Sequence, residues 1–122
     1  MNTTTEELTR AKQRTRSEVP AAEVTDVRGL VSVQPGAVVS RTVISRDTGT
    51  VTLFAFDEDQ RLSEHTAPFD ALAFVLEGQA EITIDGTPFE LSAGEAILMP
   101  AHHPHAVHAI SEFKMLLIMI RS

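Results

Sequence analysis

The stretch 80-AEITIDGTPFEL-91 carries the clearest structural signal in this chain of 122 residues. Asp85 and Gly86 stand between two short runs of strand-forming residues, and an Asp-Gly pair in that position is typical of a two-residue β-hairpin turn. On both sides of this hairpin, further runs rich in apolar and β-branched residues alternate with turn sequences. These predicted strands span residues 37–45, 50–56, 71–78, 96–100, 105–110 and 113–120.

The spacing of these runs predicts the fold class. About eight strands with turn signals every 8 to 12 residues, and no long segment of helical period, predict an all-β barrel or sandwich. We expect residues 21–122 to form one domain, preceded by an N-terminal tail over residues 1–20. That tail is either a short helix from about Glu6 to Arg14 or frayed chain, because it offers only a thin apolar face.

Composition excludes several classes of function. The formal net charge is −7, and no basic stripe stands against it, so nucleic acid is not an expected partner. The longest apolar run, 115-MLLIMI-120, is far too short to cross a bilayer, and the N-terminus lacks the apolar region of a secretory signal. The chain has no cysteine, which fits a cytoplasmic location and leaves histidine and carboxylate oxygen as the ligands for any transition metal.

The last predicted strand, 113-FKMLLIMI-120, is apolar on both faces. A strand with one face in water would alternate apolar and polar residues, so both faces of this one need cover. The second face would be covered by the N-terminal segment of the chain or by a second copy. Of these two we expect a homodimer.

Four of the five histidines lie close together near the C-terminus, and the fifth is His65. Alternate residues of a strand share a face, so His103 and His105 are predicted to point the same way and could offer two imidazoles to one cation. His102 is expected to lie in a loop, and His108 is expected to face solvent or the exterior of the sheet.

Two segments, 65-HTAPFDALAFVLEG-78 and 94-GEAILMPAHHPHAV-107, resemble the two motifs of the cupin family. These motifs read G-x5-H-x-H-x3,4-E-x6-G and G-x5-P-x-G-x2-H-x3-N, and the resemblance covers roughly residues 36–120. It implies a cupin-type β-barrel, a jelly roll of two antiparallel sheets, with a site inside the barrel. The matching positions are His65, Gly78, Gly94, Pro100 and His105.

The chain departs from these motifs at several positions. Ala67 stands where the first motif has its second histidine, and Ala71 stands where it has its glutamate. A methyl group cannot bind a metal, so the resemblance carries over only His65 and His105 as ligands. The other departures are Asp59 and His102 at motif glycines and Ala109 at the final asparagine.

These residues predict a metal site and a pocket. If the fold brings His65 to the cluster, as the cupin layout implies, then His65, His105 and His103 would hold a divalent ion such as Zn, Ni, Fe or Mn. Glu64 and Asp70 are weaker candidates for a ligand or a base. Small side chains leave room for a ligand inside the barrel, unless methionines fill that room. The predicted lining residues are Ala67, Ala71, Ala73, Val75 and Met99.

Three functions stay open at this level. The first is a metal cupin, binding or catalytic, in which oxygen atoms of a small organic molecule complete the shell of the ion. The second is a metal-free module that binds a small molecule through hydrogen bonds from His65 and His105. The third is a scaffold for assembly or regulation. The sequence specifies no reaction and does not decide whether the protein is an enzyme.

Overall fold

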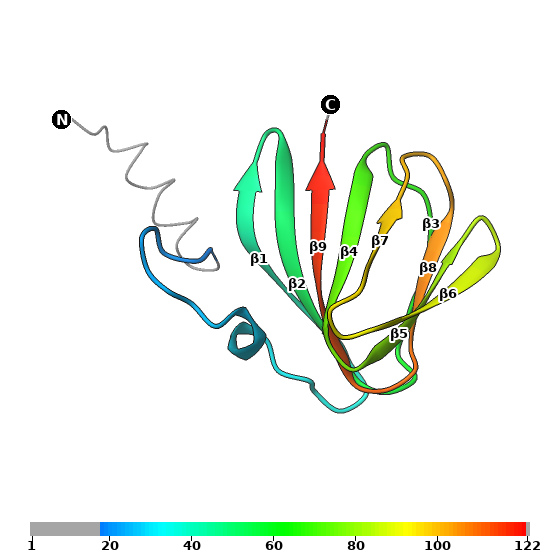
Figure 1. Ribbon diagram of the computed structural model, residues 1–122, viewed down its shortest axis with the longest axis horizontal. Helices are drawn as coiled ribbons and strands as arrows, with labels where there is room; N and C mark the ends of the chain where they lie inside the picture. The colour runs from blue at the N-terminus through cyan, green and yellow to red at the C-terminus, as the bar shows by residue number, and fades with distance from the viewer. Residues whose placement is uncertain (1–17, 122) are drawn as a thin grey trace.

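The computed structural model describes residues 18–121 and confirms the all-β prediction (Figure 1). These residues form nine strands and one short 3-10 helix, and they contain no helix long and apolar enough to cross a membrane. The helix considered for Glu6–Arg14 lies outside the described residues. The elements are η1 (Val27–Leu30), β1 (Val38–Arg46), β2 (Gly49–Phe56), β3 (Arg61–His65), β4 (Asp70–Glu77), β5 (Gln79–Ile84), β6 (Thr87–Ser92), β7 (Ala96–Met99), β8 (His105–Ala109) and β9 (Phe113–Ile120).

The strands form two antiparallel sheets. The five-stranded sheet has the order β1-β2-β9-β4-β7, and the four-stranded sheet has the order β3-β8-β5-β6. The predicted hairpin joins β5 to β6, and both of its turn residues have positive φ, 50° at Asp85 and 79° at Gly86. That backbone is the type I′ turn, whose twist matches the twist of the flanking strands.

Strand β3 was missed by the sequence prediction, although it carries His65. Four of its five residues are exposed, and Leu62 is its one apolar side chain, so it lacks the apolar alternation that identified the other strands. Among the described strands it pairs with β8 alone, far along the chain, at the edge of the four-stranded sheet. Pairing with a distant strand, and not local propensity, therefore defines it.

The two largest fully buried side chains of the described residues, Phe56 and Phe113, lie at one end of the barrel. There the rings of Phe56 and Phe113 stack with centroids 4.4 Å apart. Along the inward face of β9, Phe113 and Met115 are fully buried, whereas Leu117 and Met119 are only partly buried. The strands of the two sheets converge at this end, which lies at the bottom of Figure 1. We call it the packed end.

Gly78 shows how tightly the packed end is closed. It connects β4 to β5 with a φ of 77°, a conformation that favours glycine. A Cβ atom here would also run into the backbone carbonyl of Glu112. The closing glycine of the first cupin motif is thus required by both the backbone conformation and the space.

The segment before β1 covers part of the outer face of the five-stranded sheet. Its apolar residues pack with the outward side chains of β1, β2 and β9 in a second buried cluster around Val43 and Leu53. Polar contacts hold it there: Lys114 Nζ donates to the Arg28 carbonyl at 2.6 Å, and the Val19 amide donates to the Val43 carbonyl at 3.1 Å. The chain therefore covers part of the second apolar face of β9 itself.

Candidate functional site

The structure brings His65 and His105 together. His65 is the last residue of β3 and His105 the first of β8, and the two are cross-strand partners. Their Nε2 atoms lie 3.1 Å apart, and the rings meet edge to face with centroids 4.3 Å apart. His105 is buried, with 7% of its surface exposed, whereas His65 is exposed. The pair thus joins the barrel interior to solvent at the end opposite the packed end, which we call the histidine end.

A β-bulge turns His65 inward. Leu62 pairs with Val107 and His65 pairs with His105, so three steps along β3 match two steps along β8. In a regular strand Leu62 and His65 would point to opposite faces. The extra residue lets both of them face the interior, which is a recognised effect of bulges near binding sites.

The remaining hydrogen bonds of the two rings fix their tautomers. His65 Nδ1 lies 2.9 Å from the Ser63 carbonyl, and His105 Nδ1 lies 3.2 Å from the His103 carbonyl. A carbonyl oxygen can only accept, so both Nδ1 atoms must carry the proton and donate it. In neutral rings both Nε2 atoms then present lone pairs to each other across 3.1 Å.

Two unprotonated nitrogens this close repel each other, and a cation or a proton between the rings would relieve that repulsion. Imidazole nitrogens bind Zn²⁺ at about 2.0–2.1 Å, so two nitrogens 3.1 Å apart would subtend an angle of about 100° at one ion. That angle lies between the values of octahedral and tetrahedral coordination. Donation of the other ring nitrogen to a backbone carbonyl is also the usual arrangement of a metal-binding histidine.

The environment keeps His105 neutral. Burial is the main cause that lowers the pKa of His105 below its ordinary value, and the nearby His65 lowers it further. The hydrogen bond to the His103 carbonyl acts in the opposite direction and does not outweigh them. A neutral ring is the form that binds a metal, so this shift reduces competition from protons.

His103 lies beside the pair and bonds to a different partner. Its Nδ1 is 2.6 Å from Asp85 Oδ2, and its side chain is half exposed. The prediction that it shares a strand face with His105 is not met, because β8 begins only at His105 and His103 lies in the preceding turn. Within residues 18–121, no three His, Asp or Glu side chains form a group that could hold an ion. A role as third ligand therefore stays a prediction.

Most of the predicted pocket residues face the interior. Ala71, Ala73, Val75 and Met99 are buried in the core cluster between the sheets. Ala67 is half buried in the loop after β3, where its carbonyl accepts from the His102 amide at 2.8 Å. That a ligand reaches these side chains stays a prediction. Of the four buried residues in β4 and β7, Ala71 follows the loop after β3 most closely, because β4 begins at Asp70.

Thr50 is an interior residue that the sequence prediction overlooked. It shares the inward face of β2 with Phe54 and Phe56, and its cross-strand partner Met119 also pairs with Ala71. Its Oγ1 is the one buried side-chain oxygen or nitrogen without a hydrogen-bond partner in the described chain. An unsatisfied buried hydroxyl is costly and calls for a partner, and sequence alone gives no sign of it.

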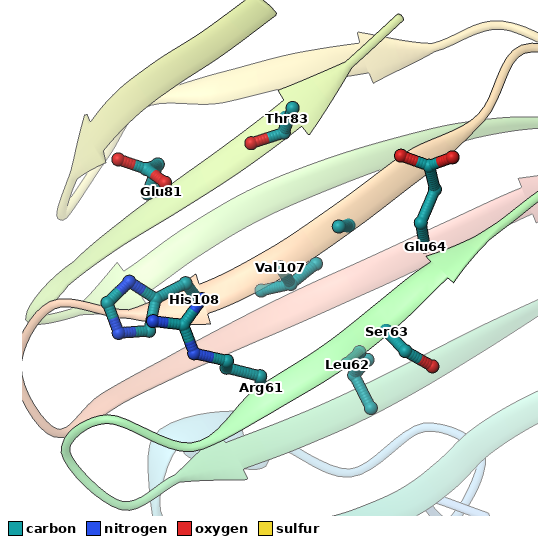
Figure 2. A pocket seen from close by; sticks show the side chains of 9 residues that line it. Arg61, Leu62, Ser63, Glu64, Glu81, Thr83, Val107 and His108 are labelled. Carbon is teal, nitrogen blue, oxygen red and sulfur yellow. The ribbon is translucent and has the colours of Figure 1, made fainter. Parts of the chain in front are cut away.

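A separate groove of about 390 Å³ lies on the outer face of the four-stranded sheet (Figure 2). Glu64 points into this groove and away from the histidine pair, which lies on the inner face. His108 also lies here, as expected for a residue on the sheet exterior, with Nε2 3.3 Å from Asp59 Oδ1. The residues that line the groove are Arg61, Leu62, Ser63, Glu64, Glu81, Thr83, Ala106, Val107 and His108.

Asp70, the other acidic candidate, has a structural contact. Its Oδ1 accepts from the Ala101 amide at 2.9 Å and so holds the loop that precedes His105. Neither acidic candidate therefore joins the histidine pair.

Comparison with known proteins identifies the family. The model of the cupin domain matches residues 52–121, so the chain belongs to the cupin family. A conserved protein of unknown function from Streptococcus pyogenes is 35% identical, with a TM-score of 0.81 over 86% of this chain and 92% of that one. A cupin superfamily protein from Desulfitobacterium hafniense is 28% identical, with a TM-score of 0.81 over 86% of this chain and 96% of that one. No curated protein matches the sequence.

A third solved structure agrees with this assignment. It is the cupin 2 conserved barrel domain protein from Leptotrichia buccalis, which is 37% identical, with a TM-score of 0.75 over 77% of this chain and 46% of that one.

The backbone shows that the cupin motifs are correctly placed on this chain. Asp59 and His102 stand where the motifs have glycines, and each has a φ of 66°. Left-handed backbone is unusual for residues with a side chain. Both positions therefore have the backbone conformation that a glycine at that place in the motif would favour.

Proposed function

We propose that this cupin binds a divalent metal ion through His65 and His105 and that a small organic molecule completes the shell of the ion. The observation that carries the proposal is the pair of Nε2 atoms, 3.1 Å apart, whose rings both donate Nδ1–H to backbone carbonyls. This arrangement leaves an unprotonated Nε2 on each neutral ring, and the two nitrogens are close enough to share one ion. Zn, Ni, Fe and Mn ions all accept imidazole nitrogen, so donor type alone does not select among them.

The missing ligands indicate what the organic molecule supplies. Ala67 and Ala71 replace a histidine and a glutamate of the motif, so about half of the usual protein ligands are absent. Both remaining donors are neutral, and the ion would keep its full positive charge. A molecule with one or more anionic oxygen donors, such as a carboxylate, suits those open positions best.

Thr50 supports a ligand inside the barrel. Its buried Oγ1 lacks a partner among the described residues, and Thr50 lies in the same cross-strand row as Ala71. A ligand oxygen or an ordered water would satisfy that hydroxyl. When bound, a divalent ion would lower the pKa of a coordinated water and so supply a base or nucleophile. We propose no particular reaction.

A metal-free binding module is the second candidate. One proton between the two Nε2 atoms would also relieve the facing lone pairs, because one ring would then donate and the other accept. In that form the histidine end would bind a small anion through the charged pair. The proposed setting is the cytoplasm, which fits the absence of cysteine.

Metal binding by calorimetry separates these candidates. The protein is purified without an affinity tag, its metal content is measured, and Zn²⁺, Ni²⁺, Fe²⁺ and Mn²⁺ are titrated into the metal-free form. We expect one ion per chain, and His65→Ala and His105→Ala should each lower the affinity by about 100-fold or more. His108→Ala is the matched control, because His108 lies on the other face of the sheet, and it should bind normally. If no ion binds to the wild type, the metal-free candidate replaces the first.

A further inference from the structure

The turn of the β5–β6 hairpin contacts the loop that leads into His105. Asp85, the first residue of this turn, makes the contact through two groups. Its Oδ2 accepts from His103 Nδ1 at 2.6 Å, and its amide donates to the Pro104 carbonyl at 2.9 Å. A carboxylate oxygen can only accept, so His103 Nδ1 carries the proton of this bond. One hairpin residue thus holds both residues that precede His105.

His105 depends on this loop for the hydrogen bond that fixes its tautomer. Its Nδ1 donates to the His103 carbonyl at 3.2 Å, and this bond leaves Nε2 without a proton in the neutral ring. That carbonyl belongs to the peptide between His103 and Pro104, which comes before the first residue of β8. The pairing of β8 with β5 ends at His105, so cross-strand pairing does not fix this peptide.

The other contacts of this peptide are weaker. Pro104 has no amide hydrogen to donate, and the His103 amide donates to the Pro100 carbonyl over a longer distance of 3.3 Å. The acceptor in the bond to Asp85 is charged, which makes that hydrogen bond stronger than one between neutral groups. Asp85 is therefore the main anchor of the His103 carbonyl among the described residues.

The hairpin in turn fixes the position of Asp85. The strands β5 and β6 pair up to Ile84 and Thr87, directly beside the turn. The positive φ of 50° at Asp85 is what a type I′ turn requires, and Asp adopts it more readily than most residues with a side chain. Asn and Gly also suit this position, so the carboxylate can be altered while the turn is kept.

We infer that Asp85 is a positioning residue of the metal site: it holds His103 so that the His103 carbonyl keeps the Nδ1 proton of His105. This inference rests on the proposed function, because its consequence is the affinity of the histidine pair for an ion. The side chains of Asp85 and His103 are both about half exposed, so their bond adds little to the stability of the fold. Its effect is expected in the tautomer of His105.

The same bond would also suit a histidine that binds the ion itself, since metal ligands usually donate their other ring nitrogen to such a partner. Within residues 18–121, however, no third side chain joins His65 and His105 in a group that could hold an ion. The geometry therefore favours a role for His103 through its carbonyl, and the experiment must separate the two roles.

The proton positions of the metal-free protein provide the first test. At about pH 8, where an ordinary imidazole is neutral, long-range proton–nitrogen NMR should find the proton of His105 on Nδ1. Asp85→Gly removes the carboxylate, so His105 should become a mixture of its two tautomers. Asp85→Asn keeps an acceptor oxygen and should preserve the Nδ1 proton. In calorimetric titration with Zn²⁺, Asp85→Gly should bind about tenfold more weakly than the wild type, with Asp85→Asn in between.

Asp59→Gly is the matched control. Asp59 is also an aspartate with left-handed backbone, with a φ of 66°, and its carboxylate also contacts a histidine, His108. That histidine lies on the outer face of the four-stranded sheet. The control should therefore change neither the tautomer of His105 nor the zinc affinity.

His103→Ala separates positioning from direct binding. If His103 acts through its bond to Asp85, this variant should weaken zinc binding as much as Asp85→Gly, and the double variant should bind no more weakly than either. A far greater loss in His103→Ala would make His103 a ligand and overturn the inference, as would a His105 tautomer that Asp85→Gly leaves unchanged. If the wild type binds no zinc, the proposed function fails, and the tautomer of His105 still decides the role of Asp85.

Discussion

The packed end and the histidine end of the barrel are built from the same strands but satisfy different needs. At the packed end, Phe56 and Phe113 stack among other apolar side chains, and these rings have no polar atom that needs a hydrogen-bond partner. At the histidine end, the side chains of His65, His105 and Thr50 are left with lone pairs or a hydroxyl that no residue within 18–121 satisfies. On the function proposed above, the first end stabilises the fold and the second end binds the ligand.

The largest effect is expected from a cavity at the packed end. Phe113→Ala removes a fully buried ring that stacks on Phe56, and it should lower the free energy of unfolding by about 3–5 kcal/mol. Urea unfolding followed by circular dichroism measures this loss. The metal affinity of the folded variant should stay within about twofold of the wild type, since cavity effects are local. A large loss of affinity would show that the two ends are not independent.

A gain of binding is expected at the histidine end. Ala67→His restores the second histidine of the motif in the half-buried loop after β3, and a third imidazole should raise the metal affinity by about tenfold. Calorimetric titration with Zn²⁺ measures the change, and His105→Ala in the same background should remove it. Unchanged affinity would mean that the loop does not carry position 67 to the ion.

The pH dependence of stability should also originate at the histidine end. Burial lowers the pKa of His105 in the folded state below the ordinary value of 6.5, so the unfolded chain binds more protons between those two pKa values. The metal-free protein should therefore lose stability as the pH falls below about 6.5 and through the folded pKa. His105→Gln should flatten this part of a plot of unfolding free energy against pH. A slope that is the same in both proteins would exclude His105 as its source.

The smallest effect is expected from the strained loop at the histidine end. His102 has a φ of 66°, and its amide bonds to the Ala67 carbonyl. His102→Gly relieves a strain of about 1–2 kcal/mol but adds flexibility to the unfolded chain, so the net gain should be about 0.5 kcal/mol. Thermal unfolding measures it. A loss of stability would show that the His102 side chain makes a stabilising contact.

Much of the barrel could be predicted from sequence because its signals are local. The Asp85-Gly86 turn and the paired apolar runs identify eight of the nine strands in residues 18–121. Strand β3 escaped because its residues are mostly exposed and its partners on β8 are 40 or more positions away along the chain. Nothing in its own composition distinguishes it from a loop.

The candidate site was predictable only in part, for a related reason. The motif spacing indicates that His65 and His105 meet, but the bulge in β3 and the two Nδ1–H bonds to carbonyls depend on pairing between distant strands. The bond from His103 to Asp85 likewise joins a turn to a hairpin. Alternation along β8 could not predict the bond of His103, because β8 begins at His105, two residues after His103. The unpaired hydroxyl of Thr50 is visible only in three dimensions.

Long-range proton–nitrogen NMR of the imidazole rings tests the metal site most directly. With one equivalent of Zn²⁺, the Nε2 resonances of His65 and His105 should shift together while both Nδ1 atoms keep their protons. The rings of His102 and His108 should not respond. If either Nε2 carries a proton in the presence of Zn²⁺, or if neither resonance moves, the two facing lone pairs do not form a metal site.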